Sequence, residues 1–455
     1  MRQRWKDKDI TVLGFSKSGI AAAEYLAEKG ANCIISDSKT STAEDKNTIK
    51  RLESLGIKIE LGEHKESSII NADIIITSPG IPPHSDVIKL AKKHNIAIFS
   101  EIDVAFLATT KPFIAITGTN GKTTVTKLVS EIFQKAGFKA PACGNIGYPA
   151  ISAVAENPDF LILEISSYQI ATSKTFRPQI AAYLNYTADH VDWHGSEEEY
   201  FNAKASLFTS SSAPVWAVLN ASDSKVLGIA SKIKSKHIYF NREHYVEDCV
   251  YIKNDAIYSQ HKKVTSEVIK LNEIPLIGNH NHQNVMAAVS IAVASGIDLE
   301  TIKNTIIAFK SPEHRIEFVE TIDNIDYFND SKATNTDSAI CALNAFDEKV
   351  VLIAGGKDKG TLLNEFVKKI NEKVASVILI GEAADRFENE LKQANYNKIY
   401  RASTLEEAID KAHALNLGSV LFSPACASFD MFKNYEERGH AFKNYVYKKK
   451  QTGKA

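Results

Sequence analysis

The sequence lacks paired cysteines. Its five cysteines are scattered over 455 residues, and no two stand in a C-x-x-C spacing. Structural zinc sites and the disulfide frameworks of small secreted proteins both need closely spaced cysteines. The sequence therefore predicts neither a zinc site nor a disulfide framework, and it favours a reducing compartment, the cytoplasm.

Long hydrophobic runs are also missing. No segment approaches the roughly 18 to 20 consecutive apolar residues that a membrane-spanning helix requires. Residues 1–7 are charged and lack the apolar stretch of a secretory signal. We therefore expect no membrane-spanning segment, no signal peptide and no membrane partner.

The chain has almost no net charge. Lys and Arg number 54 and Asp and Glu number 55, which gives a formal net charge of −1. Proteins that bind DNA or RNA through their overall field carry a basic excess. We expect no nucleic-acid partner, and any polyanionic ligand must be bound by local groups.

What the chain does contain is a regular alternation of short apolar runs with helical patterns, which is typical of βαβ units and largely parallel sheets. Its length suggests about three domains at roughly 150 residues each. Residues 240–275 alternate less regularly and predict a small antiparallel patch. We expect an α/β fold with domains at 1–110, 111–312 and 313–455. Strands are predicted at 10–13, 33–36, 74–77, 113–117, 160–163, 180–185, 215–219, 325–328, 350–354, 377–380 and 420–422, and helices at 20–29, 125–136, 197–208 and 281–294.

The sharpest local motif lies between the strand at 113–117 and the helix at 125–136. Its sequence, G-T-N-G-K-T-T, is shorter than a standard P-loop. Glycines let backbone amides approach a triphosphate, and a helix amino end adds positive potential there. Lys122 would reach the β and γ phosphates, and the Thr123 hydroxyl would bind Mg²⁺. The motif predicts a nucleotide phosphate site, formed by Gly118, Thr119, Asn120, Gly121, Lys122, Thr123 and Thr124.

Other polar residues follow predicted strands, where the ligand crevice of an open α/β sheet lies. Glu164 is either a functional carboxylate or an ordinary strand-end carboxylate, and His190 follows the next strand. Asp192 and His194 are interpreted as loop residues. Local sequence predicts that Lys204 is a solvated lysine on a helix and that Asn281 is an N-cap.

The first domain has its own glycine-containing turn between a strand and a helix. Gly14, Phe15 and Ser16 form it, but the spacing is not G-x-G-x-x-G, so NAD binding is weakly supported. Asp37 ends the next strand and is suited to a nucleoside hydrogen bond. Residues 77–81, which include Ser78 and Gly80, form another strand-end loop.

Together these motifs resemble the muramyl (Mur) ligases and their folylpolyglutamate synthase cousins. The resemblance runs from Gly14 to Arg438 and implies a Rossmann-like first domain that binds a UDP-linked substrate, a central P-loop ATPase-like domain, and a Rossmann-like third domain that binds an amino acid. It implies ATP and two Mg²⁺ ions as cofactors. Glu164 and His190 match the family's magnesium ligands, and Lys204 matches its carbamylated lysine, whose carbamate would be an anionic oxygen donor.

The resemblance also assigns binding residues. Those matched to the nucleotide, besides the phosphate loop, are Asn281, Asn284, His314, Arg315, Asp330 and Lys332. Those matched to the UDP-linked substrate are Gly14, Phe15, Ser16, Asp37, Ser78, Gly80 and Asn145.

Two motifs in the third domain, at 329–335 and 423–439, resemble the family members that add D-glutamate to UDP-N-acetylmuramoyl-L-alanine for peptidoglycan. The Asp-Asn-Pro-Arg motif of the diaminopimelate-adding relatives is absent from the sequence. The residues matched to the incoming amino acid are His190, Thr334, Lys359, Ser428 and Tyr435, where Tyr435 stands at a position that is often Phe.

The resulting hypothesis is an ATP-dependent carbon–nitrogen ligase, active as a cytoplasmic monomer, that works through an acyl phosphate. Lys122, Glu164, His190 and Lys204 are its candidate catalytic residues. Two alternatives stay open. One is another amide ligase, such as a folylpolyglutamate synthase; the other is a plain ATPase or a non-enzymatic nucleotide switch.

Overall fold

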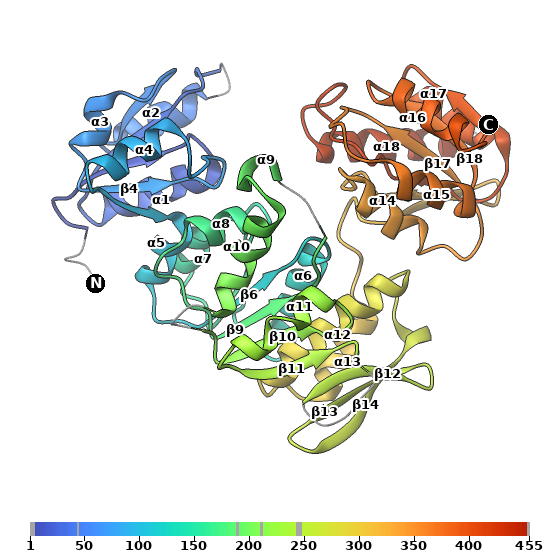
Figure 1. Cartoon of the computed structure of the whole chain (residues 1–455), viewed down its shortest axis with the longest axis horizontal. Coiled ribbons are helices and arrows are strands. Elements are labelled where there is room, and N and C mark those ends of the chain that lie inside the picture. Colours follow the sequence, from blue (N-terminus) through green and yellow to red (C-terminus); the bar gives the residue numbers. More distant parts are fainter. Residues whose placement is uncertain (1–4, 43–44, 188–190, 210–212, 243–247, 453–455) are drawn as a thin grey trace. The chain divides into compact units, whose positions relative to one another are not determined.

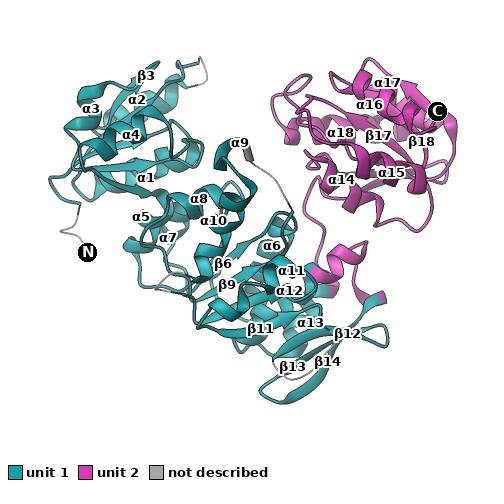
Figure 2. Cartoon of the chain, viewed as in Figure 1, with its two compact units in different colours: residues 1–271, 284–306 teal, residues 272–283, 307–455 magenta. Residues whose placement is uncertain are grey.

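The structure, a computed structural model, describes residues 5–42, 45–187, 191–209, 213–242 and 248–452. The chain forms two compact units (Figure 2). Unit 1 comprises Met1–Leu271 and Asn284–Ile306, and unit 2 comprises Asn272–Gln283 and Ile307–Ala455. Unit 1 contains two sheets and unit 2 contains one, so the predicted α/β class with three largely parallel sheets is confirmed.

The first sheet has the strand order β3-β2-β1-β4-β5, and all its pairings are parallel. The order reverses between β1 and β4, so the loops that follow these two strands meet at a switch point, where open α/β sheets bind ligands. Its strands are β1 (Asp9–Leu13), β2 (Asn32–Asp37), β3 (Lys58–Leu61), β4 (Ile74–Thr77) and β5 (Ala97–Ser100), and its helices are α1 (Lys17–Glu28), α2 (Lys46–Ser54), α3 (Glu66–Ile70), α4 (Asp86–Lys93) and α5 (Glu101–Ala108).

The second sheet has the order β14-β13-β12-β11-β10-β9-β6-β8-β7. It is parallel from β7 to β12 and antiparallel from β12 to β14, which confirms the antiparallel patch predicted at 240–275 (Figure 1). Its strands are β6 (Phe113–Thr117), β7 (Ala142–Gly144), β8 (Leu161–Glu164), β9 (Ile180–Tyr183), β10 (Trp216–Asn220), β11 (Lys236–Phe240), β12 (Cys249–Lys253), β13 (Ala256–His261) and β14 (Val264–Lys270).

The helices of this middle stretch begin with a long helix directly after β6. They are α6 (Lys122–Lys135), α7 (Ala150–Ala155), α8 (Ser167–Thr172), α9 (Val191–His194), α10 (Glu197–Thr209), α11 (Ser224–Leu227), α12 (Asn279–Ala294) and α13 (Leu299–Ala308), with 3-10 turns at Ala230–Lys232 and Leu271–Glu273.

The third sheet has the order β15-β16-β20-β17-β18-β19, and only β15 runs antiparallel. The loops after β16, β20 and β17 therefore emerge side by side. Its strands are β15 (Glu317–Ile322), β16 (Ile325–Asn329), β17 (Val350–Gly355), β18 (Val374–Ile380), β19 (Ile399–Arg401) and β20 (Val420–Phe422), and its helices are α14 (Thr336–Leu343), α15 (Asn364–Lys373), α16 (Ala384–Gln393), α17 (Leu405–Leu415) and α18 (Tyr435–Thr452).

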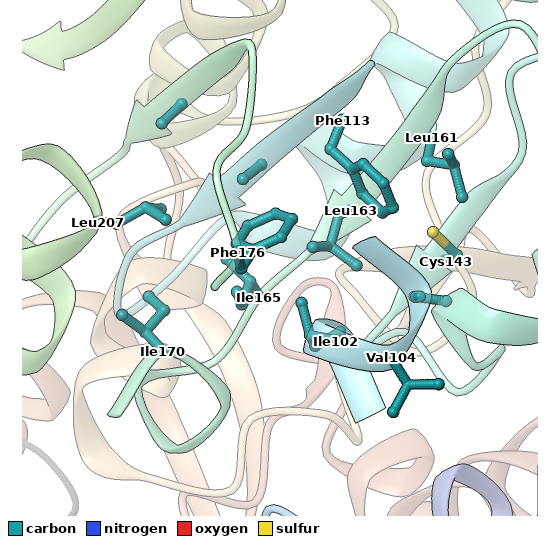
Figure 3. Close-up of a cluster of buried hydrophobic side chains, with 14 of the residues drawn as sticks. Ile102, Val104, Phe113, Cys143, Leu161, Leu163, Ile165, Ile170, Phe176 and Leu207 are labelled. Atoms are coloured by element: carbon teal, nitrogen blue, oxygen red, sulfur yellow. The ribbon is translucent and has the colours of Figure 1, made fainter. Parts of the chain in front are cut away.

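One apolar core joins the two sheets of unit 1. Figure 3 shows Ile102 and Val104, from α5, in the same cluster as second-sheet residues such as Leu163. The rings of Phe113 and Phe176 meet edge to face at a centroid distance of 5.4 Å. Each fully buried side chain of this kind contributes about 1.5–3 kcal/mol, and α5 adds Ile102, Val104 and Ala105 to this shared core.

The strands predicted from sequence all overlap observed strands. The sequence did not predict six observed strands, which are short, lie near a sheet edge or contain many polar residues. They are β3, β5, β7, β11, β15 and β19. Within the described part of the chain, no helix combines the length and apolar character needed to cross a bilayer.

Candidate functional site

The phosphate loop connects the buried strand β6 to α6. Gly121 occupies the N-cap of α6 with φ +84°, in the left-handed region that favours glycine. A Cβ on Gly121 would lie 2.2 Å from Asn284 Oδ1, so any side chain there would clash. A glycine cap leaves the first turn of α6 to bind an anion, because the amino end of a helix attracts phosphate.

Lys122 is the first residue of α6 and folds over this loop. Its Nζ donates to the carbonyl oxygens of Gly118 at 2.8 Å and Thr119 at 2.7 Å. The next two residues, Thr123 and Thr124, are buried, with 4% and 3% of their surface exposed. The loop thus gathers an ammonium group and a threonine hydroxyl at the start of one helix, as the sequence motif predicted.

Asn185, which follows β9, braces the phosphate loop. Its Oδ1 accepts a hydrogen bond from the Asn120 amide at 2.8 Å, and its Nδ2 donates to the Asn120 carbonyl at 3.1 Å. Thr119 Oγ1 donates to the Thr187 carbonyl at 3.0 Å. Sequence reasoning missed Asn185, although a polar amide directly after a buried strand next to β6 was a usable signal.

Lys204 is buried, which makes the prediction of a solvated lysine wrong. Only 2% of its surface is exposed, its Nζ donates to the Gly118 carbonyl at 3.0 Å, and it lies 4.8 Å from the centroid of the Tyr200 ring. Tyr200, Lys204 and Phe208 are spaced at i, i+4 and i+8 on α10, so they share one helix face. That spacing could have placed Lys204 on the aromatic face of α10, but it does not show what this face packs against.

Glu164 ends β8, which pairs with β6, and its register partner is Ile116, just before the phosphate loop. It is 2% exposed, and its Oε1 accepts a hydrogen bond from Asn145 Nδ2 at 2.8 Å. The carboxylate of Glu164 and the hydroxyl of Thr123 are hard oxygen donors, the type that Mg²⁺ prefers. The described residues therefore fit a magnesium ion beside the phosphate loop.

His190 lies outside the described residues. The short helix α9 follows it, so the interpretation of Asp192 and His194 as loop residues is wrong. His194 is 9% exposed, and its Nε2 lies 2.9 Å from Ser167 Oγ. His194 is thus a hydrogen-bonded core histidine.

The two asparagines near the start of α12 have different surroundings. Because α12 begins at Asn279, Asn281 lies in the first turn, and the prediction that it is the N-cap is wrong. Its Nδ2 donates to the Ile277 carbonyl at 2.7 Å. Asn284 is 6% exposed and lies against Gly121, so it contacts the phosphate loop.

In the first sheet, the turn after β1 meets the loop after β4. Gly14 has φ +106°, and a Cβ there would lie 2.6 Å from Ser78 Oγ. Ser16 caps α1, and its Oγ lies 3.1 Å from Ser78 Oγ. Asp37 Oδ2 accepts a hydrogen bond from the Phe15 amide at 2.7 Å. The structure therefore brings Gly14, Phe15, Ser16, Asp37 and Ser78 together.

Gly80 lies two residues beyond Ser78 in the same loop. A Cβ on Gly80 would meet no described atom within 4 Å. This glycine therefore leaves open space beside the switch point of the first sheet.

In unit 2, Asp330 follows β16 and is 4% exposed. Its Oδ2 accepts a hydrogen bond from Ser423 Oγ at 2.7 Å, and its Oδ1 accepts one from the Ile316 amide at 3.3 Å. Burial raises the pKa of Asp330 to about 7. The carboxyl group is thus held between the loops after β16 and β20.

His314 and Lys332 both lie near the ring of Tyr435. His314 is 3% exposed, its Nδ1 lies 2.9 Å from Asn329 Nδ2, and burial lowers its pKa. The Nζ of Lys332 lies 5.2 Å from the centroid of the Tyr435 ring, and the His314 ring lies 6.1 Å from it. Arg315 follows His314 and is half-buried.

Arg438 is the residue of unit 2 that sequence reasoning passed over. It is 1% exposed, and its Nη2 donates to the Ser331 carbonyl at 2.7 Å while its Nη1 donates to the Ala427 carbonyl at 3.2 Å. Burial lowers its pKa to about 10. A single guanidinium therefore ties the loop after β16 to the loop after β20. In the sequence, Arg438 marked only the end of the family resemblance and had no predicted role.

Four described residues are matched to the amino acid: Thr334 lies after β16, Lys359 after β17, Ser428 after β20, and Tyr435 begins α18. Ser428 is 2% exposed, Thr334 is half-buried, and Lys359 is exposed. The loops after β17 and β20 are joined where the Lys357 amide donates to the Ala427 carbonyl at 2.9 Å. The structure thus places Lys359 and Ser428 in two neighbouring, hydrogen-bonded loops of one sheet.

With this geometry in view, three family models match the chain. The Mur ligase middle domain matches residues 116–292, the Mur ligase glutamate ligase domain matches 314–426, and the MurD-like N-terminal domain of Mur ligases matches 8–100. The chain belongs to the Mur ligase family. The three matched ranges follow the three sheets in order and include the phosphate loop, the switch point of the first sheet and Asp330. Ser428, Tyr435 and Arg438 lie beyond the last matched residue, 426.

Relatives support this membership over the full length. UDP-N-acetylmuramoylalanine--D-glutamate ligase from Caldanaerobacter subterraneus subsp. tengcongensis is 43% identical over 447 residues, 97% of this chain and 98% of that protein. The enzyme of the same name from Clostridioides difficile is 39% identical over 448 residues, 97% of this chain and 98% of that protein.

Among solved structures, UDP-N-acetylmuramate-alanine ligase from Thermotoga maritima matches with a TM-score of 0.60 at 17% identity, over 97% of this Mur ligase and all of that chain. Folylpolyglutamate synthase from Mycobacterium tuberculosis matches with a TM-score of 0.58 at 15% identity, over 76% of this chain and 92% of that one. These two likenesses concern the fold.

Proposed function

We propose that this Mur ligase adds D-glutamate to UDP-N-acetylmuramoyl-L-alanine in an ATP-dependent step of peptidoglycan precursor synthesis. The observation that carries the proposal is the 43% identity, over 97% of the chain, to a protein named for that reaction. The diaminopimelate-adding and folate-linked branches of the family are the alternatives that the assay below separates.

The domains of the proposed enzyme are 1–110 for the UDP-linked substrate, 111–312 for ATP and 313–455 for the amino acid. In this proposal, the ATP-binding residues are Gly118, Thr119, Asn120, Gly121, Lys122, Thr123, Thr124, Asn281, Asn284, His314, Arg315, Asp330 and Lys332. The UDP-substrate residues are Gly14, Phe15, Ser16, Asp37, Ser78, Gly80 and Asn145, and the D-glutamate residues are His190, Thr334, Lys359, Ser428 and Tyr435.

The reaction proceeds in two balanced steps. A carboxylate oxygen of the alanyl group attacks the γ-phosphorus of ATP, the bond to the β-phosphate oxygen breaks, and ADP leaves. The amine of D-glutamate then attacks the acyl carbon, loses a proton, and expels inorganic phosphate. Lys122, at the amino end of α6, supports the first step because a fixed ammonium stabilises the charge that develops on the transferred phosphoryl group.

Mg²⁺ would be held by Thr123, Glu164 and His190, with Lys204 as a carbamate, and bound Mg²⁺ neutralises phosphate charge. The buried position of Lys204 supports the carbamate. A carbamylated lysine keeps one N–H, so Nζ can still donate to Gly118, whose carbonyl now lies 3.0 Å away. The added carboxylate would supply an anionic oxygen at the phosphate loop.

A phosphate-release assay tests the proposed function. We expect release only when ATP, UDP-N-acetylmuramoyl-L-alanine and D-glutamate are all present, with L-glutamate and diaminopimelate as poor replacements. Equal rates with diaminopimelate would move the enzyme to another branch of the family. Turnover with a folate acceptor would assign it to the folylpolyglutamate synthases, and release without any acceptor would make it a plain ATPase.

We also propose that the enzyme acts as a monomer in the cytoplasm. Sedimentation of the active enzyme at assay concentration measures the first point directly. A fully active dimer whose activity is lost when dilution dissociates it into monomers would overturn the monomer proposal.

A further inference from the structure

Helix α5 carries two buried carboxylates that none of the roles above uses. Glu101 is 3% exposed and Asp103 is fully buried. Buried carboxylates are costly unless hydrogen bonds satisfy them. Each of the two therefore has to be explained by the groups that it binds, and the two bind different segments of the second sheet's domain.

Asp103 binds the segment that follows α8. Its Oδ1 accepts hydrogen bonds from the Thr175 amide at 2.7 Å, from Thr175 Oγ1 at 2.8 Å and from Ser173 Oγ at 2.8 Å. Its Oδ2 completes a capping box by accepting from the Ser100 amide at 2.9 Å. The bonds to Oδ1 fasten α5 to a loop that contains none of the proposed binding residues.

Glu101 binds the start of α7 instead. Its Oε1 accepts a hydrogen bond from the Ile151 amide at 2.7 Å. The N-cap of α7 is Pro149, whose side chain has no acceptor, so Glu101 supplies the capping oxygen from another element. Burial raises the pKa of Glu101 to about 7, against the opposing effect of the Ile151 and Ala150 amides.

Only a tight turn separates α7 from Asn145. The Gly144 amide donates to the Tyr148 carbonyl at 2.7 Å, and the Gly147 amide donates to the Gly144 carbonyl at 3.1 Å. Asn145 in turn donates from Nδ2 to Glu164 Oε1 at 2.8 Å. Because these hydrogen bonds connect the turn, a shift of the first turn of α7 would also displace the Asn145 side chain.

Glu101 is also tied to the first sheet. It follows Ser100, the last residue of β5, whose register partner on β4 is Thr77. Thr77 precedes Ser78, which lies against Gly14 at the switch point. Glu101 thus directly follows the end of β5. The loop that carries Ser78 lies beside this strand end, and the turn that carries Asn145 is connected to it through the Glu101 carboxylate.

We propose that Glu101 is a positioning residue for the UDP-linked substrate: its carboxylate holds the first turn of α7 and so sets Asn145 relative to the Ser78 loop. This inference rests on the proposed function, in which both Asn145 and Ser78 contact that substrate. Asp103, equally buried on the same helix but bound to another loop, is a matched control.

The test measures KM for each of the three substrates, kcat and the melting temperature in four variants. Glu101→Ala should raise KM for UDP-N-acetylmuramoyl-L-alanine about tenfold, the effect of one lost buried hydrogen bond, while KM for ATP and for D-glutamate changes less than about twofold. Glu101→Gln should stay within about threefold of the parent, because its amide oxygen still accepts from Ile151. Glu101→Asp retracts the carboxylate and should fall between the two.

Asp103→Asn should lower the melting temperature and leave the ratio of the substrate KM values unchanged. A Glu101→Ala enzyme with the same substrate KM ratio as Asp103→Asn would overturn the proposal and leave Glu101 a purely structural group. If Glu101→Ala does not fold, the same comparison is made with Glu101→Asp.

Calorimetric binding of UDP-N-acetylmuramoyl-L-alanine, without turnover, separates this inference from the proposed function. A parent enzyme that binds this nucleotide but does not ligate D-glutamate would overturn the proposed reaction alone. Equal affinity in the parent and Glu101→Ala would overturn the positioning role alone.

Discussion

Two turns of unit 1 have the same construction but opposite chemistry. The turn after β1 and the turn after β6 each run from a buried strand through a left-handed glycine into a helix. In the first, Ser16 caps α1 with its side chain, and the carboxylate of Asp37 binds the Phe15 amide. In the second, Gly121 is the cap, and two lysines, Lys122 and Lys204, donate to the loop.

The difference shows that the strand–glycine–helix frame does not by itself decide what is bound. In the first turn, side chains bind the amides of Gly19 and Phe15, and the carboxylate of Asp37 can accept hydrogen bonds from the hydroxyl or N–H groups of a nucleoside. A glycine-capped turn with cations attracts a triphosphate. We therefore propose that the side chains around each turn divide the two nucleotides between the two sheets, and the predictions below test this division.

The largest expected effect comes from Lys122. Lys122→Ala should lower kcat roughly a thousandfold, about 4 kcal/mol of transition-state stabilisation, while the protein stays folded. Lys17, the first residue of α1, is the matched control, and Lys17→Ala should leave KM for ATP and the release of phosphate nearly unchanged. A folded Lys122→Ala enzyme with normal turnover would remove this loop from the mechanism.

Lys204 should rank next, with roughly hundredfold losses for the removal of one oxygen donor to a catalytic metal. Because a carbamate needs a primary amine, Lys204→Arg should be as inactive as Lys204→Ala. Formate or acetate should partly restore the alanine variant by filling the vacated space. Carbon-13 NMR of the parent with labelled bicarbonate should show a carbamate signal that Lys204→Arg lacks.

An arginine variant as active as the parent would contradict that account. Lys204 would then act through its positive charge alone, and both lysines of the second turn would serve as cations.

Asp37 tests the acidic turn. Asp37→Ala frees the Phe15 amide and removes the proposed nucleoside contact, so KM for the UDP-linked substrate should rise about tenfold at an unchanged KM for ATP. Steady-state kinetics with each substrate varied in turn gives both values. A rise in KM for ATP instead would break the division of roles between the two turns.

The smallest effect concerns the carboxylate of Asp330, which is buried, whereas that of Asp37 is half-buried. Burial raises its pKa from the ordinary 3.8 to about 7 in the folded protein. At pH values between 3.8 and about 7, the folded protein keeps a proton on Asp330 that the unfolded chain has lost. The free energy of unfolding therefore falls as pH rises through this range. Asp330→Asn should flatten that slope in urea titrations from pH 4 to 8. Parallel slopes for variant and parent would show that Asp330 keeps its ordinary pKa.

The sequence was informative wherever a function depends on neighbours along the chain. The alternation of apolar runs predicted the sheets, and the G-T-N-G-K-T motif predicted the turn after β6, because glycine torsions and helix starts are set locally. The same local reasoning failed for Lys204, since only the packing of α10 against the loop carbonyl of Gly118 buries its amine. It also predicted that the helix now called α12 starts at residue 281, two residues after its observed first residue, Asn279.

Long-range cross-links were out of reach for the same reason. Arg438 lies 107 residues from Ser331 in the sequence, yet its guanidinium holds that loop. Glu101 lies 50 residues from Ile151. No pattern of spacing reveals such pairs, because their cause is the strand order of a sheet and not the order of the chain.

The acyl phosphate is the central claim, and the transfer of oxygen-18 tests it most directly. The alanyl carboxylate of UDP-N-acetylmuramoyl-L-alanine is labelled, and the inorganic phosphate formed with ATP and D-glutamate is analysed by mass spectrometry or phosphorus NMR. The account predicts that each phosphate released carries one oxygen from that carboxylate. Unlabelled phosphate, or label that appears in AMP, would contradict it.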